Sequence, residues 1–524
     1  MPQGDEMKNR SSMIFLALVC SAASSLFPAT AGYAYRPNRN VATATPIQYL
    51  VVIFQENNAF DHYFGTYPNA ANPPNEPQFY PAPGTPSVNG LTGPLLTANP
   101  NFLNSANGAG AINPFRLDRS QASTCDNINH YKNEQEAYDG GLLDLFPTFT
   151  SATTSCPPGV IAPPGLAMGY YDGNTVTALW NYAQQYAMSD NNFATEFGTT
   201  VMGHINLISG DTHQTNVASN ADIANGSIIA NINPAKILDD CTSGTTVEMT
   251  SKNVGDLLNA QGITWGWFYG DFAATGFSGG VAQCGANYNP HYDPFQYYAS
   301  TANPHHLPPS SVNAIGQASD QANHQYALTD FFNALGAGNL PAVSFLKASF
   351  GETGHPSDGT PLEEQTFLVN TINQLVQSPA WSRMAILVTY DDSDGWYDHV
   401  MPPIENQSHD PSQDALLGST GLCGTLQPGA YNDRCGYGPR LPLLAISPFA
   451  KSNYVDHALT DQTSILRFIE ENWGLGQIGD QSFDAKAGSI LGLFDFDHPR
   501  NQRLLLDPDS GELVFPGHDR DGGD

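Results

Sequence analysis

Positive charge is scarce in this 524-residue chain, which has 19 Lys and Arg against 50 Asp and Glu and a formal net charge of −31. Charged residues of both signs make up only 13%, against a usual share of about 25%. So acidic a surface repels nucleic acid and anionic membranes at long range, and we exclude nucleic acid as a partner. A phosphate site would need its own local positive charge, most economically from a metal ion.

Long apolar runs are also missing, since no segment has the length and apolar character of a membrane span. We therefore expect no stable membrane insertion. The first 31 residues are typical of a signal peptide: Lys8 and Arg10 precede a short apolar core at 13–19, and Ala29 and Ala31 form an A-x-A cleavage site. This pattern predicts a secreted or periplasmic protein, and a buried N-terminal helix is the alternative.

Cysteine pairs with C-x-x-C spacing are absent, which argues against a zinc site made of thiolates. Removing the signal peptide removes Cys20 and leaves an even number of cysteines, which favours disulfides in an exported chain. Six cysteines allow 15 pairings, and the sequence does not choose among them. We expect pairing in chain order. The six are Cys125, Cys156, Cys241, Cys284, Cys423 and Cys435.

Neither an internal repeat nor a composition break divides the chain. We expect one catalytic domain over 32–506, with a loop-rich insertion at about 68–165 that is dense in Pro, Asn and Gly, and a polar, fraying tail at 507–524.

Apolar runs and helical periodicity alternate along this domain, which predicts an α/β fold with a mainly parallel central sheet. Continuous apolar runs indicate buried strands, and spacing near 3.6 residues indicates helices. Expected strands are 47–57, 263–270, 383–392 and 440–450; expected helices are 175–190, 366–378 and 464–473; segment 204–210 fits either.

Oxygen-bearing side chains end two of the buried strands. Glu56 and Asn57 follow the first, and Asp391 and Asp392 follow the run "AILVTY". Ligands of open α/β sheets lie outside the carboxyl ends of the strands, so we expect these four residues to meet. Crowded carboxylates resist ionising unless a cation joins them, and oxygen ligands suit a hard divalent metal.

Two other interpretations of these aspartates remain. One is a solvated turn at "DG", and the other is a loop calcium site, because "DDSDG" partly resembles an EF-hand loop. That match lacks the alternating acids and the later bidentate Glu.

A pair of threonines and several histidines are further candidates. Thr199 and Thr200 follow Gly198, and a threonine hydroxyl becomes a nucleophile beside a metal or at a helix N-terminus. Among 14 histidines, His291 and His355 are candidates to bind phosphate when protonated. A capping role for the threonines and ordinary packing of the histidines are the alternatives.

Several long motifs in the same order resemble the bacterial phosphoesterase family that includes phospholipases C and acid phosphatases of the phospholipase C type, in the alkaline phosphatase-like superfamily. "QENNAFDHYFGTYPNA" is similar to its opening motif, E-N-x-S-F-D-H-x-F-G-T. "TYDDSDGWYDHVMPP", "GYGPRLPLLAISPFAK" and "DQTSILRFIEENW" are similar to later blocks. The resemblance spans nearly the whole mature chain and implies a parallel-rich sheet flanked by helices on both faces.

The resemblance also implies site residues. One metal ion, whose identity among calcium, magnesium, manganese and iron is open, would be held by Glu56, Asn57, Asp391 and Asp392. Aligning "FGTTVMGH" with the family pattern G-P-[ST]-x-P places Thr200 at the nucleophile. Both family prolines are missing, so Thr199 remains a rival. His291 and His355 match phosphate-facing histidines.

One family position is displaced. The family carries a histidine in a D-x-D-H-x-Y block before "EQ", whereas here Asn129 aligns with it and His130 follows. Either His130 serves after a loop adjustment, or Asn129 replaces it as a neutral donor.

The implied reaction is two-step hydrolysis of a phosphate ester through a phosphothreonine enzyme, fastest on the acid side of neutrality because charged histidines bind phosphate best. No basic amphipathic helix is evident, so small phosphate monoesters, as for an acid phosphatase, are preferred over phosphatidylcholine-like lipids, as for a phospholipase C. A secreted, non-catalytic calcium-binding protein is the alternative of another class.

Overall fold

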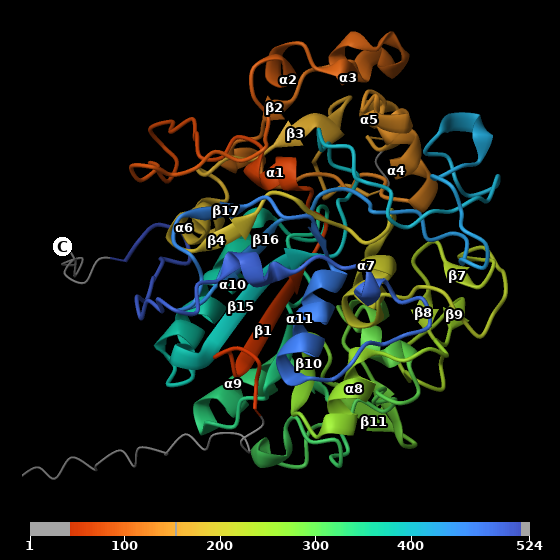
Figure 1. The fold of residues 1–524 in the computed structure, drawn as a ribbon, viewed down its shortest axis with the longest axis vertical. Coiled ribbons are helices and arrows are strands. Elements are labelled where there is room, and N and C mark those ends of the chain that lie inside the picture. Colours follow the sequence, from red (N-terminus) through yellow and green to blue (C-terminus); the bar gives the residue numbers. More distant parts are fainter. Residues whose placement is uncertain (1–41, 152–154, 515–524) are drawn as a thin grey trace, which may run out of the picture. The chain divides into compact units, whose positions relative to one another are not determined.

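An eight-stranded sheet forms the centre of this computed structural model, which describes residues 42–151 and 155–514 (Figure 1). The signal peptide expected at 1–31 lies outside the described residues. The strand order is β13-β10-β14-β1-β15-β16-β4-β17. The strands are β1 (Tyr49–Gln55), β4 (Ala187–Ser189), β10 (Trp265–Tyr269), β13 (Gln325–Ala327), β14 (Val343–Lys347), β15 (Met384–Tyr390), β16 (Leu443–Ile446) and β17 (Tyr454–Asp456).

The sheet is mixed, so the expected mainly parallel arrangement is confirmed only in part. Strands β13, β10, β14, β1 and β15 are parallel neighbours, and β4 is parallel to β17. Strand β16 runs antiparallel to both β15 and β4. A strand buried on both faces has the same apolar pattern in either direction, so its sequence does not reveal this reversal.

Helices account for most of the remaining regular structure: α1 (Phe60–Phe64), α2 (Pro94–Thr97), α3 (Pro100–Leu103), α4 (Tyr131–Tyr138), α5 (Phe146–Phe149), α6 (Thr177–Gln185), α7 (Thr200–Ser209), α8 (Val254–Gln261), α9 (Leu328–Ala337), α10 (Pro361–Gln377) and α11 (Thr463–Trp473). The helix expected at 175–190 ends at Gln185, because the residues after it pair with β16 as β4. Segment 204–210, which fitted either element, belongs mainly to α7. None of the described helices combines the length and apolar character that a membrane crossing requires.

Short two-stranded pairs lie outside the main sheet: β2 (Phe115–Arg116) with β3 (Gly169–Tyr170), β5 (Asn192–Phe193) with β18 (Thr460–Asp461), β6 (Ile223–Ala224) with β7 (Ser227–Ile228), β8 (Asn233–Pro234) with β9 (Thr246–Val247), and β11 (Gly276–Ser278) with β12 (Val281–Gln283). The insertion at about 68–165 holds only short elements joined by loops. The tail expected to fray is held in its described part, where Asn181 Nδ2 donates to the Gly511 carbonyl at 2.8 Å.

Strands β1 and β15 place the ends of their apolar runs side by side. Every residue of both strands is buried, and their parallel register pairs Gln55 with Tyr390. The residues that follow, Glu56 and Asp391, therefore leave the sheet at the same edge.

Helix α7 approaches this edge very closely because it carries Gly203. A Cβ added there would lie 2.1 Å from the Asp391 carbonyl oxygen, nearer than any side chain allows. The glycine therefore sets how near Thr200, at the start of α7, comes to the ends of β1 and β15.

Arg440 ties the start of the β16 region to the segments that follow β1 and β15. Its buried guanidinium donates to Asp398 Oδ1 at 2.9 Å and to Asp61 Oδ1 at 3.1 Å.

Disulfides link the six cysteines in chain order, as expected: Cys125 to Cys156, Cys241 to Cys284, and Cys423 to Cys435.

Candidate active site

The four residues expected to bind metal lie together beyond the ends of β1 and β15. Glu56, Asn57, Asp391 and Asp392 are at most 2% exposed. The Asn57 backbone N–H donates to Asp391 Oδ1 at 2.9 Å, which joins the two strand ends directly. Asn57 itself has φ of 58°. Asparagine tolerates this left-handed conformation better than most residues.

Oxygen atoms of three of these residues lack hydrogen-bond partners within the described part of the chain: Glu56 Oε2, Asn57 Oδ1 and Asp391 Oδ2. Asp394 helps to orient the amide of Asn57, because Asn57 Nδ2 donates to Asp394 Oδ1 at 3.0 Å. Buried acceptors without donors are costly, and these are the oxygen types that hard divalent cations prefer. The donor set therefore fits a divalent metal ion.

Electrostatics leads to the same inference. Burial and then the neighbouring Asp391 raise the pKa of Glu56 well above its usual value. The same two causes raise the pKa of Asp392. Carboxyl groups this crowded do not all ionise unless positive charge joins them.

Two residues that sequence reasoning missed also reach the cluster. Lys347, the last residue of β14, contacts Glu56 Oε1 through its buried Nζ. His204 Nε2 lies 3.7 Å from Glu56 Oε1, and His204 Nδ1 lies 3.7 Å from Asp391 Oδ2. A strand-end rule applied to "VSFLK" would have found Lys347, and a helix begun at Thr200 would have placed His204 one turn later on the same face.

His204 is a further candidate ligand. Its Nδ1 is 2.8 Å from the Thr200 carbonyl oxygen, an acceptor, so we assign the proton to Nδ1. This assignment leaves Nε2 as an acceptor without a partner among the described residues. Burial lowers the pKa of His204 well below its usual value, so the ring is neutral, as a metal-binding imidazole must be.

Both candidate nucleophiles lie at the N-terminus of α7. Thr200 is its first residue, and its Oγ1 donates to Asp392 Oδ2 across a long 3.5 Å. Thr199 precedes the helix, and its Oγ1 has no partner in the described ranges. The positive end of the helix dipole faces both hydroxyls and favours negative charge there.

A cavity of about 560 Å³ opens in front of the threonines. Asn57, Thr199, Thr200 and His355 line it, together with Asn129 and other mostly polar residues. His355 is thus brought to the same space as the expected nucleophile.

Of the two neighbouring residues Asn129 and His130, Asn129 is the one that contacts the acidic cluster, and the role of either residue in the reaction stays a prediction. The Asn129 side chain hydrogen-bonds the Asp392 carboxylate and lowers its pKa against the larger effect of burial. His130 is exposed, precedes α4 and lines only the cavity wall. Neighbouring side chains point in different directions, so one residue of offset separates these two surroundings.

His291 lies in a short 3₁₀ turn, Pro290–Tyr292, and is not among the residues that line this cavity. Burial lowers its pKa to about 4, so it is neutral in the free protein through most of the acidic range. The expectation that charged histidines make acid conditions favourable therefore receives no support from His291 without bound phosphate.

Glu134 joins the two loops of the site and was not anticipated. It lies on α4, accepts from the Gly198 backbone N–H at 2.9 Å, and contacts the Ser393 hydroxyl. One carboxyl thus connects the turn before the threonines to the residue after Asp392. Burial raises its pKa to about 8.

Residues 47–476 match the model of the phosphoesterase family. The chain belongs to this family. A non-hemolytic phospholipase C from Pseudomonas aeruginosa is 25% identical over 527 residues, covering 96% of this chain and 66% of the relative. Phospholipase C A from Mycobacterium tuberculosis is 26% identical over 483 residues, covering 87% of this chain and 79% of the relative. The chain thus spans about two thirds of the length of the Pseudomonas relative.

Among solved structures, a protein in the alkaline phosphatase superfamily from Vibrio parahaemolyticus matches at 12% identity, with 72% of this chain and 75% of that chain covered and a TM-score of 0.29.

Proposed function

We propose that this phosphoesterase hydrolyses phosphate esters with Thr200 as nucleophile and with one divalent metal ion beside it. The observation that carries the proposal is the position of Thr200 Oγ1, which donates to Asp392 next to the buried, unpartnered oxygens of Glu56, Asn57 and Asp391.

Glu56, Asn57, Asp391 and Asp392 would hold the ion, with His204 as an additional candidate. When bound, the ion would neutralise the carboxylates and stabilise negative charge on the phosphate oxygens.

The chain's own residues account for the first step. The Thr200 hydroxyl gives its proton toward Asp392, and the N-terminus of α7 stabilises the resulting negative charge. The oxygen then attacks phosphorus, the bond to the leaving oxygen breaks, and phosphothreonine forms. His355, which lines the cavity, is placed to give the leaving alkoxide its proton.

The second step repeats the chemistry with water. A water oxygen attacks the phosphothreonine while His355 takes the water's proton, the Thr200 oxygen leaves and regains the proton held by Asp392, and phosphate is released. Asn129 would support both steps by donating to Asp392 and holding its orientation.

Small phosphate monoesters are the preferred substrates, because the cavity is lined mainly by amide, carboxyl, hydroxyl and imidazole groups rather than by surfaces that suit acyl chains. The names of the relatives favour phospholipase C activity as the second candidate. We also propose export, from the pattern of the first 31 residues.

Turnover of a chromogenic phosphate monoester and of phosphatidylcholine, each with and without a chelator, tests the proposal. We expect chelator-sensitive release of phosphate from the monoester. Cleavage of the lipid alone would transfer the preference to phospholipase C. Calcium binding without turnover of either substrate would favour the non-catalytic alternative.

Matched variants assign the nucleophile. Thr200→Ala should abolish turnover, and Thr200→Ser should restore part of it because a hydroxyl remains. Thr199→Ala should retain most of it. The reverse pattern would make Thr199 the nucleophile.

A further inference from the structure

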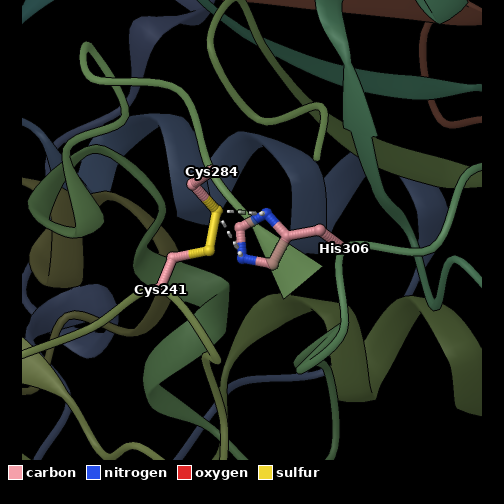
Figure 2. Close-up of side chains that lie close together, drawn as sticks. All are labelled: Cys241, Cys284 and His306. Carbon is pink, nitrogen blue, oxygen red and sulfur yellow. Dashed lines mark hydrogen bonds between the residues drawn. A yellow bond between two sulfur atoms is a disulfide. The ribbon is translucent and has the colours of Figure 1, made fainter. Parts of the chain in front are cut away.

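A second group of chemically versatile side chains lies around the Cys241–Cys284 disulfide. Cys284 Sγ is 3.7 Å from His306 Nδ1 and 4.0 Å from His306 Nε2, so the sulfur lies beside the imidazole ring at similar distances from both nitrogens (Figure 2). One ligand atom from each of Cys241, Cys284 and His306 lies within 4.8 Å of the others. The proposed reaction uses none of these residues.

His306 is fixed by strong contacts. Its Nε2 lies 2.9 Å from Asp239 Oδ1, and its Nδ1 lies 2.8 Å from the Phe272 carbonyl oxygen. The ring centroids of His306 and Phe272 lie 4.3 Å apart in a stacked arrangement, and those of His306 and Tyr288 lie 4.8 Å apart in a T-shaped arrangement. Both nitrogens face acceptors, a pattern that the doubly protonated ring satisfies.

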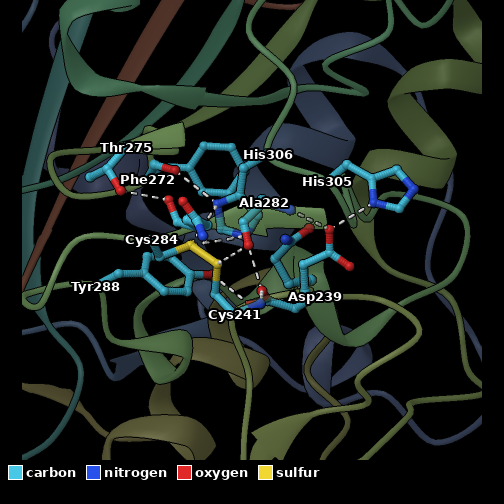
Figure 3. The surroundings of a disulfide bond; sticks show 12 residues. Asp239, Cys241, Phe272, Thr275, Ala282, Cys284, Tyr288, His305 and His306 are labelled. Carbon is cyan, nitrogen blue, oxygen red and sulfur yellow. Dashed lines mark hydrogen bonds and ion pairs between the residues drawn. A yellow bond between two sulfur atoms is a disulfide. The ribbon is translucent and has the colours of Figure 1, made fainter. Parts of the chain in front are cut away.

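Asp239 is itself held in place, which matters for a histidine ligand. It accepts from the Tyr288 hydroxyl at 2.7 Å and from the Cys241 backbone N–H at 2.8 Å, and it is fully buried (Figure 3). Histidines that bind metal commonly donate their second N–H to such a carboxylate, which orients the ring.

We propose that Cys241, Cys284 and His306 form a redox-gated site for a soft divalent cation such as Zn²⁺, closed by the disulfide and opened by a dithiol reductant. Bond lengths of a tetrahedral zinc site place a sulfur and a nitrogen ligand about 3.6 Å apart, close to the 3.7 Å between Cys284 Sγ and His306 Nδ1.

Reduction of the disulfide precedes binding of the cation. The dithiol transfers two electrons and two protons, so the S–S bond breaks, both cysteines become thiols, and the dithiol becomes a disulfide. The sulfurs then separate by rotation about their side-chain bonds. On binding, each thiol loses its proton to solvent, and Nδ1 loses its own proton and exchanges the Phe272 carbonyl for the cation. Nε2–H remains on Asp239, and solvent takes the fourth position.

Accessibility distinguishes this disulfide from the one between Cys423 and Cys435. Both of those cysteines are fully buried, whereas Cys241 and Cys284 are partly exposed. In the third disulfide Cys125 is buried and Cys156 is exposed, so a dithiol can reach that bond as well, and the double variant described below separates the two.

Cobalt titration tests the proposal on the full chain, because Co²⁺ bound by thiolates gives charge-transfer absorption that an oxygen-ligand site cannot give. Protein is reduced with a dithiol, freed of it under anaerobic conditions, and titrated with Co²⁺ and then Zn²⁺. We expect absorption that saturates near one equivalent, is displaced by Zn²⁺, and is missing from the oxidised protein. A reduced protein without this absorption would overturn the proposal.

Three variants locate the site. His306→Gln should weaken Co²⁺ binding strongly. Asp239→Asn should weaken it by about 10–100-fold, as loss of a group that orients a ligand does. His305→Gln is the matched control, because that neighbouring histidine is 2.8 Å from an Asp240 oxygen and lies away from the sulfurs (Figure 3).

Two results would count against the assignment. Unchanged Co²⁺ affinity in both His306→Gln and Asp239→Asn would show that other residues bind the metal. Retained absorption in a Cys241→Ser, Cys284→Ser double variant would place the thiolates at another pair. Circular dichroism of each variant identifies any that fails to fold. If His306→Gln does not fold, the Co²⁺ affinity of Asp239→Asn provides the test.

Discussion

Replacing Gly203 by alanine should lower activity while the protein still folds. The added Cβ would lie 2.1 Å from the Asp391 carbonyl oxygen. A relaxed contact between carbon and oxygen needs about 3.3–3.6 Å, so helix α7 or the end of β15 must move by roughly 1 Å. Thr200, three residues earlier on α7, would move with the helix.

A displacement of about 1 Å at a reacting group costs on the order of 100-fold in rate, or about 2.7 kcal/mol of activation free energy. Overpacking of a tight contact costs about 1–3 kcal/mol in the free energy of unfolding. We therefore expect Gly203→Ala to lower kcat for a phosphate monoester by about 100-fold while the protein still folds.

Gly336 provides the matched control. It lies in helix α9, and a Cβ added there would meet no atom within 4 Å. Gly336→Ala should leave kcat unchanged and raise the free energy of unfolding by about 0.5–1 kcal/mol, because alanine favours helix. Denaturant unfolding and steady-state kinetics on both variants provide the measurement. Wild-type kcat in Gly203→Ala would refute the argument that this contact positions Thr200.

Three further outcomes follow from buried charges. Glu134→Ala should lower kcat, and it should lower the free energy of unfolding by about 1–3 kcal/mol for each donor left unpaired. Glu136→Ala on the same helix should change little, and equal losses in the two variants would contradict this. Arg440→Met should lower the free energy of unfolding, measured with urea, by about 3–5 kcal/mol because two buried carboxylates lose their partner. Arg467→Met, which breaks an exposed ion pair, should lower it by at most about 1 kcal/mol. Burial and then a neighbouring carboxyl raise the pKa of Glu470 to about 9, so its protonated form stabilises the fold below the unfolded pKa near 4.5 and this contribution is lost as pH rises toward 9. The Tm of the wild type should therefore fall as pH rises toward 9, and Glu470→Gln should flatten this fall. The same pH profile in both proteins would contradict the raised pKa of Glu470.

The sequence predicted the parts of the fold whose signal is local. Apolar runs at 47–57 and 383–392 identified β1 and β15, and their polar ends indicated where a metal site would form. The meeting of Glu56 with Asp391 followed from a general rule for strand ends, and the register of the two strands confirms that they lie together. Their roles as ligands stay a proposal.

Other features depended on contacts between distant segments. The reversal of β16 leaves no local mark. Lys347 and Glu134 acquire their importance only because β14 and α4 bring them to the site. The sequence did not predict the position of His204, because its segment fitted two kinds of secondary structure. Which of Asn129 and His130 contacts Asp392 depends on the conformation of a loop, which the sequence pattern does not specify.

Rapid acid quench of the enzyme during turnover, followed by mass spectrometry of its peptides, tests the central claim most directly. If Thr200 attacks phosphorus beside the cluster formed by Glu56, Asn57, Asp391 and Asp392, a phosphoryl group should be trapped on Thr200 and be missing from the Thr200→Ala protein. Phosphate found on Thr199, or turnover that continues in Thr200→Ala, would contradict the account.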